Sequence, residues 1–108
     1  MDTHTIVALL HLLILGPLLL AVGFNYIPAN VTLALGALII VYHLYKYFGT
    51  SRGSWVNLLH ILVVGPALIL AGALPASRWP RELVLMLGFA AIGYHGLTVA
   101  TASAKSAP

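Results

Sequence analysis

Four histidines are the residues of this sequence best suited to chemistry, because each lies within a long apolar segment. They are His11, His43, His60 and His95. An ionisable side chain is costly in such surroundings and usually faces a bundle interior or a wet cavity. At a helical rise of 1.5 Å per residue, all four are expected at nearly one depth, roughly 8–10 Å inside one interface. Neutral imidazole nitrogens there are suitable ligands for haem iron or for a transition metal ion.

An internal repeat relates these histidines to one another. The Leu-His…Gly-Pro pattern of Leu9–Pro17 returns 49 residues later in Leu58–Pro66, and the Leu-Gly…Tyr-His pattern of Leu35–His43 returns 52 residues later in Leu87–His95. Two tandem helical hairpins are therefore predicted, the first at about 5–48 and the second at about 54–102. Because each hairpin crosses twice, both begin on the same side, which predicts a pseudo-twofold axis along the membrane normal.

The composition excludes a water-soluble fold. Hydrophobic residues make up 61% of the 108 residues, charged residues only 6%, and the mean hydropathy is +1.03. Soluble domains are about half apolar and about a quarter charged. The net charge of +3 is also too small for a surface that tracks nucleic-acid phosphates, so no nucleic-acid partner is expected. Since the chain has no cysteine, disulfides and thiolate ligands are excluded as well.

Four apolar segments separated by short polar stretches predict an all-α, integral membrane four-helix bundle in a lipid bilayer. The helices are expected at about 5–24, 31–47, 54–74 and 82–102, within one transmembrane domain at 1–108. Each approaches the ~20 residues that a helix needs to cross the hydrocarbon core. Lys46, Arg52 and Lys105 on the side of the termini outnumber Arg78 and Arg81 on the other side, which predicts that both termini are cytoplasmic.

A haem b with two histidine ligands fits the histidine layer. Its ligands are expected to be one pair related by the repeat, either His11 with His60 or His43 with His95. Axial ligation needs neutral imidazoles and no carboxylate, and both acidic residues lie outside the helix interiors. A bound haem would imply electron transfer or cofactor handling.

The surroundings of the histidines fit the same interpretation. Gly36 lies seven residues before His43, on the same helix face, and Gly88 repeats this position in the second hairpin. Both glycines permit close helix packing, and they would also leave room for a flat macrocycle. Lys46 and Arg52 are expected near the closer interface, where they would meet the haem propionates.

Three alternatives stay open at this point. All four histidines together could hold one transition metal ion, as imidazoles do for zinc, copper, nickel or iron. A histidine ring in a homo-oligomer could instead pass or sense protons, as an ion channel or a pH sensor. Finally, the histidines could be structural hydrogen-bond donors between helices. No catalytic residues are assigned, because the sequence shows no carboxylate pair, nucleophilic triad or cysteine.

The paired Leu-His…Gly-Pro and Gly…Tyr-His hairpins resemble those of small four-transmembrane proteins of large algal viruses. The resemblance covers the whole chain. It implies a four-span membrane architecture and brings no activity with it, so no functional residue is carried over.

Overall fold

In a computed structural model, the chain is described at residues 3–49 and 54–106, with side chains at 3, 5–49 and 54–101. The elements run α1 (Thr3–Leu10), η1 (His11–Leu15), α2 (Gly16–Gly23), α3 (Ala29–Gly49), α4 (Trp55–Leu59), η2 (His60–Val64), α5 (Gly65–Ala73) and α6 (Arg78–Ser106). The described residues contain no strand. They form four continuous helices that are long and apolar enough to cross a membrane. The all-helical prediction and the four apolar segments are thus confirmed.

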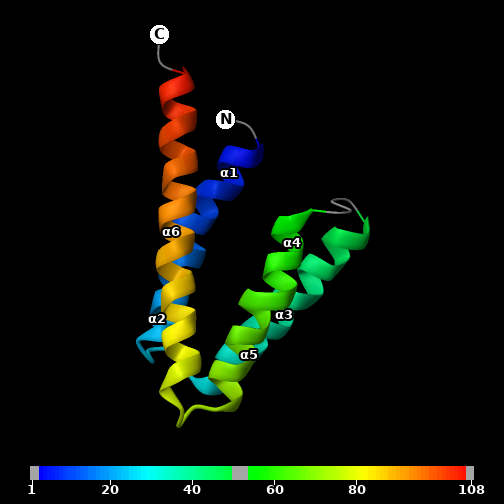
Figure 1. Ribbon diagram of the computed structural model, residues 1–108, viewed down its shortest axis with the longest axis vertical. Helices are drawn as coiled ribbons and strands as arrows, with labels where there is room; N and C mark the ends of the chain where they lie inside the picture. Colours follow the sequence, from blue (N-terminus) through cyan, green and yellow to red (C-terminus); the bar gives the residue numbers. More distant parts are fainter. Residues whose placement is uncertain (1–2, 50–53, 107–108) are drawn as a thin grey trace.

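The four helices pack as two pairs. The first helix (α1, η1 and α2) lies against α6, and α3 lies against the third helix (α4, η2 and α5). The pairs meet through α5 and α6 near the loops at 24–28 and 74–77, and they diverge toward the end that carries α1 and α4 (Figure 1). The result is an elongated V with extents of 52 × 30 × 17 Å.

The meeting point of the two pairs contains the hydrophobic core. Its fully buried members come from three helices: Val22 from the first, Leu68 from the third and Val84 from the fourth. Val64 of η2 and two small residues of α5, Ala67 and Ala71, complete the cluster. This packed apolar layer separates the histidine end of the molecule from the loop end.

A short π-helix lies between histidine and proline in both the first and the third helix. The carbonyl of His11 accepts the N–H of Gly16, and the carbonyl of His60 accepts that of Gly65, five residues on in each case. Proline lacks an N–H, and its ring clashes with the carbonyl four residues earlier. The wider π turn before Pro17 relieves this clash, and such bulges recur at functional sites.

Glycines allow the helices of each pair to approach closely. A Cβ on Gly36 would lie 3.0 Å from Leu68 Cβ and from the backbone of α5. A Cβ on Gly88 would lie 2.9 Å from Leu20 Cδ2 and 3.1 Å from its backbone nitrogen. The space that these two glycines leave is therefore taken up by the neighbouring helix.

Helix boundaries differ from the predicted ones mainly in the fourth helix. It begins at Arg78, four residues before the expected start, and so includes Pro80 in its first turn. Proline is tolerated there because the first N–H groups of a helix have no partner within it. Asn25 adopts a φ of 67°, which allows the tight turn between the first two helices.

Candidate functional site: a row of four histidines

The four predicted histidines come together in one row of imidazole rings. His95 contacts His11 with ring centroids 4.6 Å apart and planes inclined by 35°. His11 faces His60 at 6.1 Å and 77°, and His60 stacks on His43 at 4.2 Å and 7°. The order of the row is therefore His95, His11, His60, His43, and the central contact joins the two helix pairs.

The hydrogen bonds of three of these rings leave one nitrogen available. Nδ1 lies 2.8 Å from the Val7 carbonyl oxygen in His11, 2.8 Å from that of Ile39 in His43, and 2.7 Å from that of Val56 in His60. A carbonyl only accepts, so Nδ1 must be the protonated nitrogen. In the neutral ring, Nε2 then carries the lone pair, and a backbone carbonyl on Nδ1–H is a typical support for a metal-ligating histidine.

These hydrogen bonds also bear on a purely structural role. In His11, His43 and His60, Nδ1–H donates to the carbonyl oxygen four residues earlier in the same helix. Such a bond orients the ring without tying two helices together. These Nδ1 contacts are therefore not the interhelical hydrogen bonds that a purely structural role of the histidines predicts.

A buried amide lies one turn from the row. Asn57 is 6% exposed and precedes His60 by three residues, on the same side of the helix. None of the described side chains carries a buried nitrogen or oxygen without a hydrogen-bond partner, so the amide of Asn57 is a polar group near the row rather than an orphaned one. Its place one turn before His60 follows from the sequence, whereas its burial is seen only in the structure.

Two tyrosines touch the outer histidines of the row. Tyr42 meets His43 edge to face at 5.1 Å and 86°, and Tyr94 meets His95 at 5.2 Å and 83°. Both tyrosines are more than half exposed. Successive side chains on a helix are about 100° apart, yet each tyrosine ring contacts the imidazole of the next residue.

The other predicted site residues do not all lie beside the row. Lys46 is half-buried in the last turns of α3, one turn after His43. Arg52 lies outside the described residues. Gly36 and Gly88 lie deeper, in the contacts between paired helices already described, and border no recess that would take a macrocycle edge.

As the rings stand, the row is not a closed metal site. Among the described side chains, no three histidine or acidic groups converge closely enough to hold an ion. The reason is visible in the stacked contact: His43 and His60 present ring faces to each other, whereas nitrogen lone pairs lie in the ring planes. A site with more than two ligands therefore requires rotation of an outer ring.

Comparisons with protein-family models, curated proteins and solved structures gave no match to this chain. The function of the histidine row is therefore argued from its own geometry.

Proposed function

We propose that this protein is a multi-pass membrane protein that binds one transition metal ion between His11 and His60. The observation that carries the proposal is the central contact of the row, in which two rings from opposite helix pairs meet while a backbone carbonyl engages Nδ1 of each. Two imidazoles that bind one metal on opposite sides, each through a bond of about 2.0 Å to Nε2, have centroids about 6 Å apart. The 6.1 Å separation of His11 and His60 matches this spacing.

The outer histidines complete the coordination in this proposal. His95 and His43 each contact one central ring, at 4.6 and 4.2 Å between centroids. If either outer side chain rotates, its imidazole nitrogen can bind the metal ion instead of contacting the central ring. Each such rotation adds one ligand, toward the four that zinc, copper(I) or nickel accept. Asn57 then supplies a hydrogen bond to a metal-bound water or to an outer ring.

Pairwise correspondences support two tandem hairpin repeats. Ile92 faces Gly16 as Ile40 faces Gly65, 49 and 52 residues apart in the two repeats. The contact between His95 and His11 likewise corresponds to that between His43 and His60. A pseudo-twofold axis then passes between His11 and His60, so that a metal ion there receives one ligand from each repeat. We place both termini in the cytoplasm on the basic residues alone.

A haem b on the same two ligands is the second candidate. The separation of His11 and His60 suits axial ligation of a haem iron as well as that of a bare ion. The macrocycle, however, would have to separate the outer rings from the central pair. The filled space at Gly36 and Gly88 gives it no room at the deeper level, so the bare ion is favoured.

Metal analysis and absorption spectroscopy of protein purified in detergent test the proposal. We expect one equivalent of bound metal after incubation with Zn²⁺ or Co²⁺, with a visible Co²⁺ spectrum from nitrogen ligands. His11→Gln and His60→Gln should each weaken binding by more than about 100-fold, because even loss of an outer-shell partner costs 10–100-fold. A Soret band after haem addition, lost in the same variants, would transfer the assignment to haem.

Tyr42→Phe is the matched control, since it keeps the ring beside His43 and removes only a hydroxyl. It should bind metal like the unmodified chain. If neither metal nor haem binds stoichiometrically, the proposal is wrong. If all four His→Gln variants fold normally and lose affinity equally, the opposed central pair is wrong, and a four-ligand site takes its place.

A further inference from the structure

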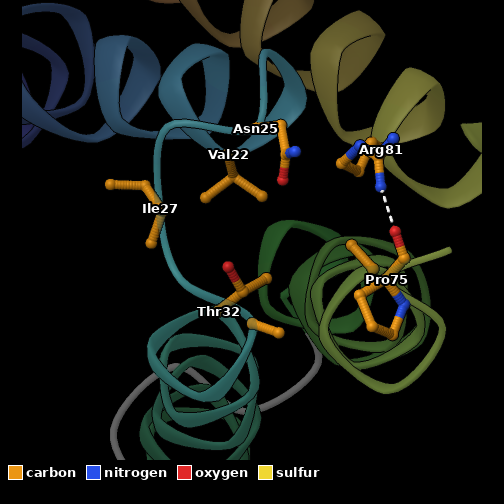
Figure 2. Close-up of a pocket in the computed structure, with 8 residues that line it drawn as sticks. Val22, Asn25, Ile27, Thr32, Pro75 and Arg81 are labelled. Carbon is orange, nitrogen blue, oxygen red and sulfur yellow. Dashed lines mark hydrogen bonds between the residues drawn. The ribbon is translucent and has the colours of Figure 1, made fainter.

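A polar recess lies at the opposite end of the molecule from the histidine row. It is a small recess of about 20 Å³ between the first, second, third and fourth helices, and it is open to the surface. Apolar side chains and three polar ones line it: Val22, Asn25, Ile27, Ala29, Thr32, Ala71, Pro75 and Arg81. Figure 2 shows Asn25 and Arg81 along one side of this space, with Thr32 and Pro75 across from them.

The charge of Arg81 has no carboxylate to balance it in the described part of the chain. Its Nη1 donates one hydrogen bond, to the Pro75 carbonyl oxygen at 2.5 Å (Figure 2). The nearby carboxylate of Glu82 lies 3.8 Å from Arg78 Nε instead. A guanidinium has five N–H donors in a planar fork, so Arg81, which lines the recess, keeps donors for a further acceptor.

The other polar groups of the recess are already oriented. Thr32 is 2% exposed, and its hydroxyl donates to the Pro28 carbonyl oxygen at 3.1 Å. Asn25 is held by its φ of 67° in the turn that follows Gly23. Its amide lies on the same side of the recess as the guanidinium and offers a neutral N–H donor there (Figure 2).

The position of the recess indicates the kind of ligand. It lies among the loops at 24–28 and 74–77, where helices that cross a bilayer reach the headgroup level. An arginine at that level can reach a lipid headgroup, and its planar fork matches the oxygens of a phosphate. We propose that Arg81 and Asn25 form a binding site for a phosphate group, supplied by an anionic lipid headgroup.

Native mass spectrometry of the delipidated protein in dodecyl maltoside tests this site. Phosphatidylglycerol, phosphatidylcholine and inorganic phosphate are added in separate titrations. We expect one phosphatidylglycerol to bind more tightly than phosphatidylcholine. Arg81→Gln should weaken this binding about 10- to 100-fold, the effect of losing a charge-assisted hydrogen bond.

Two further variants make the outcome specific. Arg78→Gln is the matched control, because it removes a charge from the same end while leaving the recess intact, and it should bind normally. Asn25→Gly suits the positive φ and removes only the amide, so it should fold normally and bind several-fold more weakly.

If phosphate alone competes at millimolar concentration and the two lipids bind alike, the site takes a phosphate from solution rather than a headgroup. If Arg78→Gln and Arg81→Gln lose affinity equally, or if neither loses any, the proposal is overturned.

Discussion

Replacing Gly72 by alanine tests the close approach of α3 and α5. The new Cβ would lie 2.7 Å from the Ala29 carbonyl oxygen and 2.9 Å from the Leu33 backbone nitrogen. Because these are backbone atoms, the helices must move apart to bring the contact from 2.7 Å to the ordinary 3.4 Å. Overpacking of this kind costs about 1–3 kcal/mol, and the helix propensity of alanine returns about 1 kcal/mol.

Gly93→Ala is the matched control, because nothing lies within 4 Å of a Cβ at this exposed position of α6. Both variants gain the same propensity, so their difference isolates the packing cost. We expect Gly72→Ala to be about 1–3 kcal/mol less stable than Gly93→Ala, which is a 5- to 150-fold difference in the folding equilibrium. Reversible unfolding in SDS-containing mixed micelles, followed by circular dichroism, measures it.

Equal stability of the two variants would refute the close packing of α3 on α5. The corresponding position in the other pair offers an independent check. A Cβ on Gly23 would lie 2.8 Å from Leu85 Cα, so Gly23→Ala should lose a similar amount of stability. Since the two glycines lie in different helix pairs, the losses should add in the double variant.

Two more substitutions test the metal site. Pro66→Ala restores the missing N–H, so the π turn should revert to α-helix and rotate His60 by about 100° relative to α5. We expect unchanged or higher stability with at least tenfold weaker metal binding by titration, and unchanged affinity would contradict the role of the bulge. Asn57→Leu removes the amide one turn from His60 and should weaken metal binding about tenfold in the same titration, and unchanged affinity would show that Asn57 takes no part in the site.

The positions of the helices can be predicted from the sequence, because each helix is marked by its own apolar segment. Twenty-residue apolar segments and the prolines and glycines between them predict where each helix lies, to within a few residues at most ends. The π turns were not predicted, since the sequence marks Pro17 and Pro66 but not how the backbone relieves the clash at each. An ordinary proline kink and a π bulge have the same local sequence.

The histidine row was predicted only as a layer. The depth of His11 or His60 in the membrane follows from the number of residues between it and the start of its apolar segment. Which histidines become neighbours in the row depends instead on how each helix is rotated about its own axis. That rotation is set by long-range contacts such as those of Gly65 with Ile40. The sequence therefore leaves two possible ligand pairs, and the structure brings His11 and His60 to the centre of the row.

The π turns give a physical reason for the central position of His11 and His60. Each turn begins at its histidine and ends just before Gly-Pro, so it adds one residue between the imidazole and the tightly packed glycine contact. One extra residue turns the histidine by about 100° relative to the deeper half of its helix. The deeper halves of the two helices are held by packing, α2 against α6 and α5 against α3. Without the π turns, the same packing of α2 and α5 would turn the rings of His11 and His60 away from each other. The two histidines could then not share the metal ion that we propose.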